Sequence, residues 1–173
     1  QEYSLDVGCG DGSFLYTLKN GVGIEASKEL AHICKLRKLR VVIADANFLP
    51  FKDEVFDLVT CIEVIEHTST PYRMLNEIYR VTKKGGRLFI STPNLAGPVY
   101  ILSQMIKRRP SPGHRVGFDP YLLSQALHLV NFKIVNLAGV IVARSSIYLP
   151  LSWVCTKIPN LATCIIAEGI KES

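Results

Sequence analysis

Short apolar runs alternate with helix-like segments along most of the chain. Runs at residues 3–7, 21–25, 41–44, 55–62 and 87–91 predict five β-strands. Apolar side chains spaced three and four residues apart predict a helix at 28–37 and another that contains Met74, Leu75, Ile78 and Val81. A short helix is expected at 13–19. Because strands that alternate with helices form parallel sheets, this pattern predicts an α/β fold with helices on both faces of the sheet.

Capping residues place the limits of several of these elements. Ser27 is a preferred N-cap for the helix at 28–37. The pair Gly85–Gly86 is expected to end the helix that contains Met74, as a C-terminal glycine does. Pro120 predicts the first position of a helix that extends to residue 130. Two later strands are expected at 132–142 and 162–170, and residues 99–112 are expected to form an inserted helix.

Length and composition limit the classes of protein to consider. The 173 residues fit a single domain spanning 1–173. The five cysteines form no C-x-x-C pair, which favours a reduced, cytoplasmic protein without a disulfide framework and predicts no metal site. No apolar run reaches the roughly 18 residues of a membrane-spanning helix. The sequence begins at Gln1, so we expect it to be part of a longer chain.

Positive charge is concentrated in the later part of the sequence. The net charge is +5, and residues 100–160 contain seven basic side chains but only one acidic side chain, Asp119. Apolar residues flank this charge in two segments, 95–118 and 143–160. Apolar side chains beside basic ones suit an amphipathic acceptor or a peripheral contact with an anionic membrane. An ordinary lid or a homodimer interface is the alternative use of the same residues.

The first chemical motif is the turn from Gly8 to Gly12, which follows the first predicted strand. Glycines let the backbone turn sharply and let a ligand approach the peptide plane. A dinucleotide fingerprint requires glycine or alanine where this chain has Ser13. Asp11 would also repel a pyrophosphate, whereas it could pair with an ammonium group. The turn therefore favours a cationic adenosine cofactor over NAD.

Acidic residues close the next three predicted strands. Glu25 could accept hydrogen bonds from ribose hydroxyls, and Asp45–Ala46 could meet an adenine. The segment 61–67, CIEVIEH, closes the fourth strand. Each residue alone could equally be a solvated or capping carboxylate. Ligands of open α/β sheets bind at the carboxyl ends of the strands, so the coincidence of four such ends predicts one binding site.

These motifs resemble those of class I S-adenosylmethionine-dependent methyltransferases, especially the small-molecule branch that includes the ubiquinone-biosynthesis enzymes. The matching segments are LDVGCGDG at 5–12, GIEAS at 23–27, ADANFLPFKDEVFDLVTCIEVIEH at 44–67, GGRLFISTPN at 85–94 and GHRVGFDPYLLSQAL at 113–127. The resemblance implies a Rossmann-like, three-layer α/β/α fold. Its doubly wound sheet would have seven mostly parallel strands, with the last strand antiparallel. It also implies a helix before the first strand, which this sequence lacks.

The resemblance assigns a cofactor role to particular residues. The first strand and its turn would line the methionine and ribose, Glu25 and Ala26 would hold the ribose, and Asp45 and Ala46 the adenine. Ile62 and Glu63 would flank the methionine end, with His67 nearby. The residues of the first strand and turn are Asp6, Gly8, Gly10, Asp11 and Gly12.

The resemblance implies methyl transfer from S-adenosylmethionine, with S-adenosylhomocysteine as the product. A hydroxyl acceptor would benefit from a general base, and His67 and His114 are the candidates. A structural or cofactor-positioning role is the alternative for each. We expect a small, hydrophobic or lipid-like acceptor; whether oxygen, carbon or nitrogen is methylated stays open. The alternative functions are a catalytically silent partner subunit and a nucleic-acid methyltransferase, which the lack of aromatics around 107–109 disfavours.

Overall fold

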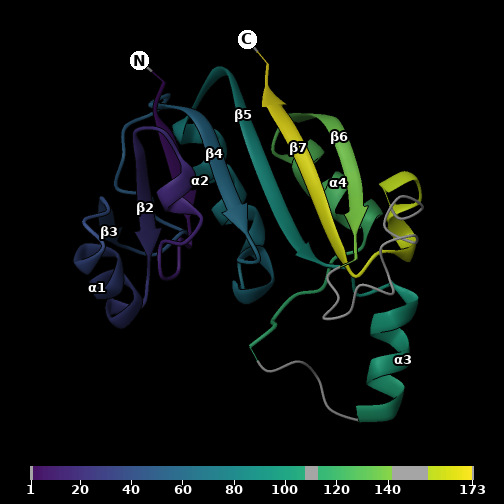
Figure 1. Cartoon of the computed structure of the whole chain (residues 1–173). Coiled ribbons are helices and arrows are strands. Elements are labelled where there is room, and N and C mark those ends of the chain that lie inside the picture. The colour runs from purple at the N-terminus through teal and green to yellow at the C-terminus, as the bar shows by residue number, and fades with distance from the viewer. Residues whose placement is uncertain (1, 108–112, 142–155, 173) are drawn as a thin grey trace.

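Seven strands form one twisted sheet in the order β3-β2-β1-β4-β5-β7-β6 (Figure 1). The computed structural model describes residues 2–107, 113–141 and 156–172. Neighbouring pairs among β1 to β5 are parallel, whereas β7 runs antiparallel to both β5 and β6. The predicted seven-stranded sheet with an antiparallel last strand is therefore confirmed. The strands are β1 Ser4–Val7, β2 Gly21–Glu25, β3 Val41–Ile43, β4 Phe56–Ile62, β5 Thr82–Pro93, β6 Phe132–Val140 and β7 Cys164–Lys171.

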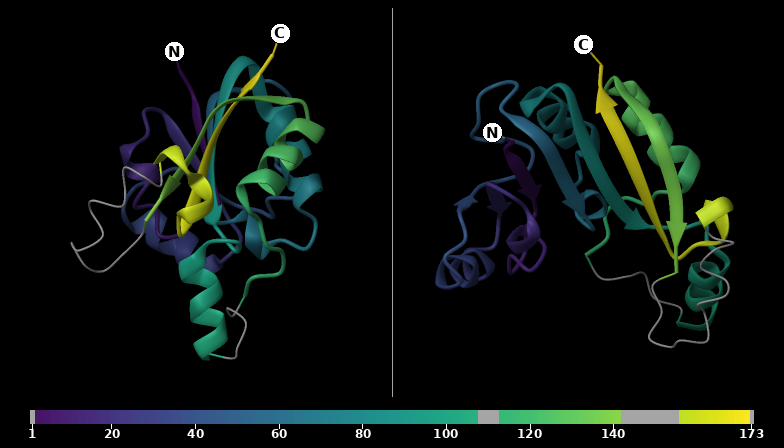
Figure 2. Two further views of the ribbon diagram at one scale, coloured as in Figure 1. Left: turned by 90° about the vertical axis from the view of Figure 1, so that its right-hand side faces the viewer. Right: turned by 45° about the horizontal axis from the view of Figure 1, so that its top comes forward.

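Helices cover both faces of the sheet, as expected for three layers (Figure 2). The main core packs α2 and α4 against the strands on one face. On the other face, Cys9 and Leu15 pack with Cys34 of α1 in a smaller core. The α-helices are α1 Lys28–Leu36, α2 Pro71–Val81, α3 Pro98–Lys107 and α4 Pro120–Leu129; the 3₁₀ helices are η1 Leu15–Thr17, η2 Ile65–His67 and η4 Pro159–Leu161.

The predicted N-cap of α1 and the predicted first residue of α4 are confirmed. The Ser27 hydroxyl accepts a hydrogen bond from the Leu30 N–H at 3.3 Å, at the start of α1. Asp119 accepts from the Leu122 N–H at 2.7 Å, and Pro120 occupies the first position of α4. Each cap satisfies one of the four N–H groups that a helix start leaves without a partner.

Two expected local structures are wrong. The short helix at 13–19 is only the 3₁₀ turn Leu15–Thr17, because Leu18 already adopts an extended conformation that leads into β2. The pair Gly85–Gly86 does not end α2, which stops at Val81 with Thr82 as its C-cap. Instead, both glycines lie within β5, whose pairing with β4 shifts register there. Gly86 is needed at this shift because a Cβ would lie 2.8 Å from the Lys83 carbonyl oxygen.

The inserted helix projects beyond the sheet on the side where the parallel strands have their carboxyl ends (Figure 1). This helix, α3, exposes Ile101, Leu102 and Met105. Arg108, Arg109 and most of the predicted loop at 143–160 lie outside the described residues. Among the residues described here, none of the helices has both the length and the apolar character needed to cross a membrane.

Candidate cofactor site at the strand ends

A pocket of about 520 Å³ opens at the carboxyl ends of β1 to β4. This volume lies within the range of small-molecule and cofactor sites. The structure thus brings together residues that lie up to 107 positions apart in the sequence. Seven of the predicted cofactor residues line the pocket: Gly8, Glu25, Ala26, Asp45, Ala46, Glu63 and His67.

Gly8 begins the turn after β1, and its backbone conformation requires glycine. Its φ is +70°, and a Cβ there would lie 2.4 Å from Cγ2 of Val64. The Gly8 N–H donates to the Ile24 carbonyl at 2.8 Å, which ties the turn to the end of β2. Gly8 therefore keeps this side of the pocket open while β1 and β4 approach each other closely.

Gly10 and Gly12 have different roles in the same turn. Gly12 is buried, and a Cβ there would lie 2.4 Å from Cδ1 of Leu39, so this glycine permits packing against α1 and the residues after it. Gly10 also has a positive φ, +57°, but no atom lies within 4 Å of the position of a Cβ. The turn therefore has open space directly over Gly10, where a ligand could approach the backbone.

Glu25 connects the glycine turn to the start of α1. Its Oε2 accepts a hydrogen bond from the Gly10 N–H at 2.9 Å, and its Oε1 accepts from the Ser27 N–H at 2.8 Å. A carboxylate has about four acceptor positions, so two backbone bonds leave capacity for a ligand. The side chain is thus held rigidly at the position where the resemblance expects the ribose.

Asp45 and Asn47 form the next wall of the pocket. Asp45 Oδ1 accepts hydrogen bonds from both the backbone N–H and the side-chain amide of Asn47, each at 2.8 Å. The Asn47 amide also donates to the Thr68 hydroxyl at 3.3 Å. Asn47 and Thr68 therefore join the loops after β3 and β4. Sequence reasoning missed both residues, although Asn47 lies only two positions from the strand-end aspartate.

Glu63 has a strained backbone at the end of β4. Its φ is +55°, a left-handed conformation that glutamate rarely adopts. Hydrogen bonds hold it there: its N–H donates to the Ser91 carbonyl at 3.1 Å, and its Oε1 accepts from the Ser91 hydroxyl at 2.9 Å. The Cys164 thiol donates to the same oxygen at 3.3 Å. Strain of this kind is concentrated at functional sites.

Five predicted residues do not line the pocket. Gly10 borders open space and Gly12 packs against Leu39, as described above. Asp11 is half-exposed, and its carboxylate forms an ion pair with Arg37 at 3.0 Å. Arg37 also donates a hydrogen bond to the Asp11 backbone carbonyl. Ile62 has a partly exposed side chain at the end of β4. The predicted pairing of Asp11 with a ligand ammonium group stays a prediction.

Asp6 is buried beneath the glycine turn. Only 2% of it is exposed, and the Thr60 hydroxyl donates to its Oδ1 at 2.7 Å. Burial raises the pKa of Asp6 to about 6, and the hydrogen bond from Thr60 partly opposes this shift. Asp6 therefore supports the turn from inside the protein and does not line the pocket.

The two candidate bases, His67 and His114, are neighbours. Their ring centroids are 5.1 Å apart and the rings meet edge to face. His67 lines the pocket, and its Nδ1 lies 3.0 Å from the Gly113 carbonyl oxygen. Arg115, which sequence reasoning did not single out, lines the same pocket. No spacing in the sequence links residues 113–115 to the end of β4, so only the fold shows this proximity.

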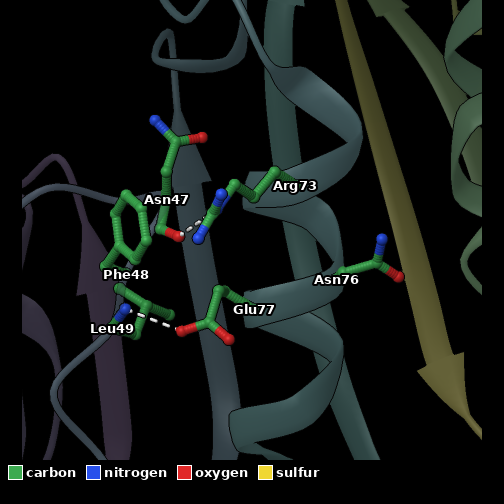
Figure 3. Close-up of a pocket in the computed structure, with 6 residues that line it drawn as sticks. All are labelled: Asn47, Phe48, Leu49, Arg73, Asn76 and Glu77. Atoms are coloured by element: carbon green, nitrogen blue, oxygen red, sulfur yellow. Dashed lines mark hydrogen bonds between the residues drawn. The ribbon is translucent and has the colours of Figure 1, made fainter.

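A second hollow, of about 570 Å³, lies beside the pocket and shares Asn47 with it (Figure 3). Arg73 covers the Phe48 ring at 3.7 Å and donates to the Asn47 carbonyl at 3.2 Å. The Leu49 N–H donates to Glu77 Oε2 at 2.8 Å. These contacts from Arg73 and Glu77 of α2 hold the loop after β3 in place.

Comparison with known proteins identifies the family of this chain. The model of a methyltransferase domain family matches residues 5–90, a range that includes the glycine turn and the strand ends from β1 to β4. The chain belongs to the class I S-adenosylmethionine-dependent methyltransferases. Members of this family use S-adenosylmethionine, so the family and the fold both imply this cofactor. A methyltransferase structure from Thermotoga maritima has the same fold, with a TM-score of 0.81 and 22% identity over 99% of this chain and 83% of that one.

Two sequence relatives of this methyltransferase chain have more specific names. The ubiquinone biosynthesis O-methyltransferase of Coxiella burnetii is 32% identical over 110 residues, which are 58% of this chain and 47% of that one. The tRNA (carboxymethyluridine(34)-5-O)-methyltransferase alkbh8 of Xenopus tropicalis is 35% identical over 111 residues, 61% of this chain and 17% of that one. The chain spans less than half the length of the curated relatives it matches.

Proposed function

We propose that this protein transfers the methyl group of S-adenosylmethionine to an oxygen of a small, hydrophobic acceptor. The observation that carries the proposal is the pocket in which the ends of four successive strands meet, with open space over Gly10. This position is where open α/β sheets bind their ligands. Both named relatives are O-methyltransferases, which supports oxygen as the methylated atom.

The pocket residues fit the parts of this cofactor. Glu25 would accept hydrogen bonds from the ribose hydroxyls, and Asp45 would hold the adenine beside Ala46. Glu63 would lie at the methionine end, and Gly10 would allow the cofactor to approach the backbone. When bound, S-adenosylmethionine supplies a methyl group on a positively charged sulfur that leaves as a neutral thioether. The protein's own contribution is to position the reactants and to exclude water.

The acceptor side combines apolar and basic groups. Arg115 lines the pocket, and its guanidinium forms no ion pair with any side chain that the structure describes. An acidic group on the acceptor would supply its partner. The helix α3 lies beyond the same end of the parallel strands (Figure 1). Its exposed apolar side chains would contact the hydrophobic part of the acceptor.

Calorimetric titration of the cofactor tests the first half of the proposal. The protein should bind S-adenosylhomocysteine, whereas NAD should not bind measurably, because Asp11 and Ser13 replace the features of a pyrophosphate site. Binding of NAD with equal affinity, or no binding of S-adenosylhomocysteine by folded protein, would contradict the cofactor assignment.

The rate of S-adenosylhomocysteine formation tests the acceptor class. We expect faster formation with a panel of acidic, alkyl-substituted phenols than with buffer alone. The alternative acceptor, tRNA, is favoured by the relationship to alkbh8 and should be run in parallel. Turnover with tRNA but with no phenol would replace the small-molecule proposal. Cofactor binding without any turnover in either arm would favour a silent partner subunit.

A further inference from the structure

Three potential metal ligands gather beside the cofactor pocket. Within the described ranges 2–107, 113–141 and 156–172, Glu66, His67 and His114 each place one ligand atom within 4.8 Å of the other two. Glu66 and His67 lie in η2, directly after β4, whereas His114 precedes α4. The sequence prediction of no metal site considered only the cysteines. His67 and His114 are 47 positions apart in the chain, and only the fold brings them together.

The orientation of His67 suits a metal ligand. Its Nδ1 lies 3.0 Å from the Gly113 carbonyl oxygen, so an N–H at Nδ1 can donate to this acceptor. That tautomer leaves a lone pair on Nε2, which lies 3.9 Å from Oε1 of Glu66. Ligating histidines commonly use one ring nitrogen for the metal and donate the other N–H to a carbonyl or carboxylate.

Glu66 is a buried carboxylate that lacks a strong cationic partner. It is 2% exposed, and its Oε2 accepts one hydrogen bond, from the Thr92 hydroxyl at 3.2 Å. An ionised carboxylate is costly to bury unless a cation compensates it. Among the described residues, its only ion-pair neighbour is His67, at 3.9 Å.

His114 supplies a second, independent observation. Its Nδ1 atom is buried and has no hydrogen-bond partner among the described residues. An unpartnered buried nitrogen is uncommon, because a lost hydrogen bond costs about 1–3 kcal/mol. The backbone around it is well fixed, since the N–H of Arg115 donates to the Glu66 carbonyl at 2.7 Å. Residues 113–115 are therefore held against η2, and the Nδ1 atom of His114 is fixed beside Glu66 and His67.

We propose that Glu66, His67 and His114 bind one divalent transition-metal ion of the zinc type at the edge of the cofactor pocket. Two imidazole nitrogens and one carboxylate form a ligand set that zinc prefers in sites with an open coordination position. Ligand atoms of tetrahedral zinc lie roughly 3.5 Å apart, so these atoms need to move by little more than 1 Å. His67 is half-exposed and can make this adjustment.

The open coordination position suggests a role for the metal ion in methyl transfer, and this role rests on the proposed function. His67 lines the cofactor pocket, so the ion would lie at the boundary of that pocket. An oxygen of the acceptor, or a water molecule, could occupy the open position. In that case His67 and His114 are metal ligands, and neither serves as the general base.

Titration with Zn²⁺ and Co²⁺ tests the proposal. The untagged chain, first freed of metal with a chelator, should bind one equivalent of Zn²⁺ in calorimetry. Co²⁺ should give visible absorption bands without the strong near-ultraviolet band of cobalt–thiolate bonds, which separates this site from the cysteines. His67→Ala and His114→Ala should each weaken Zn²⁺ binding at least tenfold. The matched control is His32→Ala, on the exposed surface of α1, which should bind as the wild type does.

Circular dichroism shows whether each variant is folded. The two histidine substitutions are at partly exposed positions, so both variants should fold. Wild-type protein that binds no Zn²⁺, or binds it equally well after both histidines are replaced, would overturn the proposal. A parallel titration with S-adenosylhomocysteine in chelator tests the cofactor pocket separately, so failure of one assignment leaves the other intact.

Discussion

Asp6 shows how a single buried residue links the glycine turn to the pH dependence of folding. Its carboxyl group is covered by the sheet and receives one hydrogen bond, from Thr60. Because burial raises its pKa from 3.8 to about 6, the folded state binds this proton more tightly than the unfolded state does. The contribution of Asp6 to stability is therefore present below about pH 4 and is lost as the pH rises through about 6.

Asp6→Asn should remove this pH dependence. An amide cannot ionise, so at pH 8 the variant should have a larger free energy of unfolding than the wild type, by up to about 3 kcal/mol. At pH 4 the two proteins should differ little. Urea denaturation at both pH values measures the difference. A difference between variant and wild type that is the same at pH 4 and pH 8 would contradict the raised pKa.

Residue identity alone was enough to locate some of the site. Glu25 and Asp45 were predictable because each carboxylate lies at the carboxyl end of a predicted parallel strand, where open α/β sheets bind ligands, and both line the pocket. Arg115 was not predictable, since its position depends on how residues 113–116 pack against η2. Asp11 has an intramolecular partner, Arg37 from the end of α1, that the spacing of the sequence does not reveal.

Secondary structure was predictable where the hydrophobic pattern was strong. The run that became β1 is buried throughout, and the runs that became β2 and β4 are buried in part, as expected for strands inside a parallel sheet. The error at Gly85–Gly86 arose because a glycine pair looks the same after a helix and at an irregularity in a strand. Only the pairing of β5 with β4 distinguishes these two environments.

One element, α2, fixes the loop that leads from β3 to β4. Arg80 donates to the Leu49 carbonyl at 3.0 Å and to the Phe51 carbonyl at 2.8 Å. The same guanidinium pairs with Glu77 of α2 and with Asp53 of the loop, both at 2.8 Å. These donors hold the chain that follows Asp45, so α2 indirectly positions the wall of the pocket that Asp45 and Asn47 form.

Arg80→Lys should therefore destabilise the fold despite preserving the charge. A single ammonium group cannot reproduce the planar set of donors, and we expect a loss of about 2 kcal/mol in the free energy of unfolding. Arg87→Lys is the matched control, because Arg87 pairs with Glu168 on an exposed part of the sheet. The control should lose less than about 1 kcal/mol in the same denaturant titration. Equal losses in both variants would contradict a special role for Arg80.

At the scale of the whole molecule, the sheet brings distant residues together at the carboxyl ends of its parallel strands, and α3 extends beyond these ends (Figure 2). Hydrophobic periodicity predicted the sheet and the antiparallel last strand followed from the family resemblance. The cluster of Glu66, His67 and His114 could not be predicted, because it depends on a contact between two segments that no sequence pattern connects.

Flotation with anionic liposomes tests whether α3 contributes to a membrane contact. At low salt the wild type should float with the vesicles, because apolar side chains and basic residues act together at such surfaces. Replacing the exposed Ile101, Leu102 and Met105 with serine should reduce the floating fraction several-fold. Leu36→Ser, which removes an exposed leucine from α1, is the control and should float normally. Absence of wild-type protein from the vesicle fraction would exclude the contact.

The central claim is that the glycine turn and the strand ends bind S-adenosylmethionine. Two glycines allow a matched test: Gly10 and Gly85 both have positive φ and open space at the Cβ position, but only Gly10 belongs to the glycine turn. Valine strains the backbone similarly at both positions. In calorimetric titration with S-adenosylhomocysteine, Gly10→Val should lose at least 100-fold in affinity, while Gly85→Val should match the wild type. Unchanged affinity in a folded Gly10→Val variant would contradict the account.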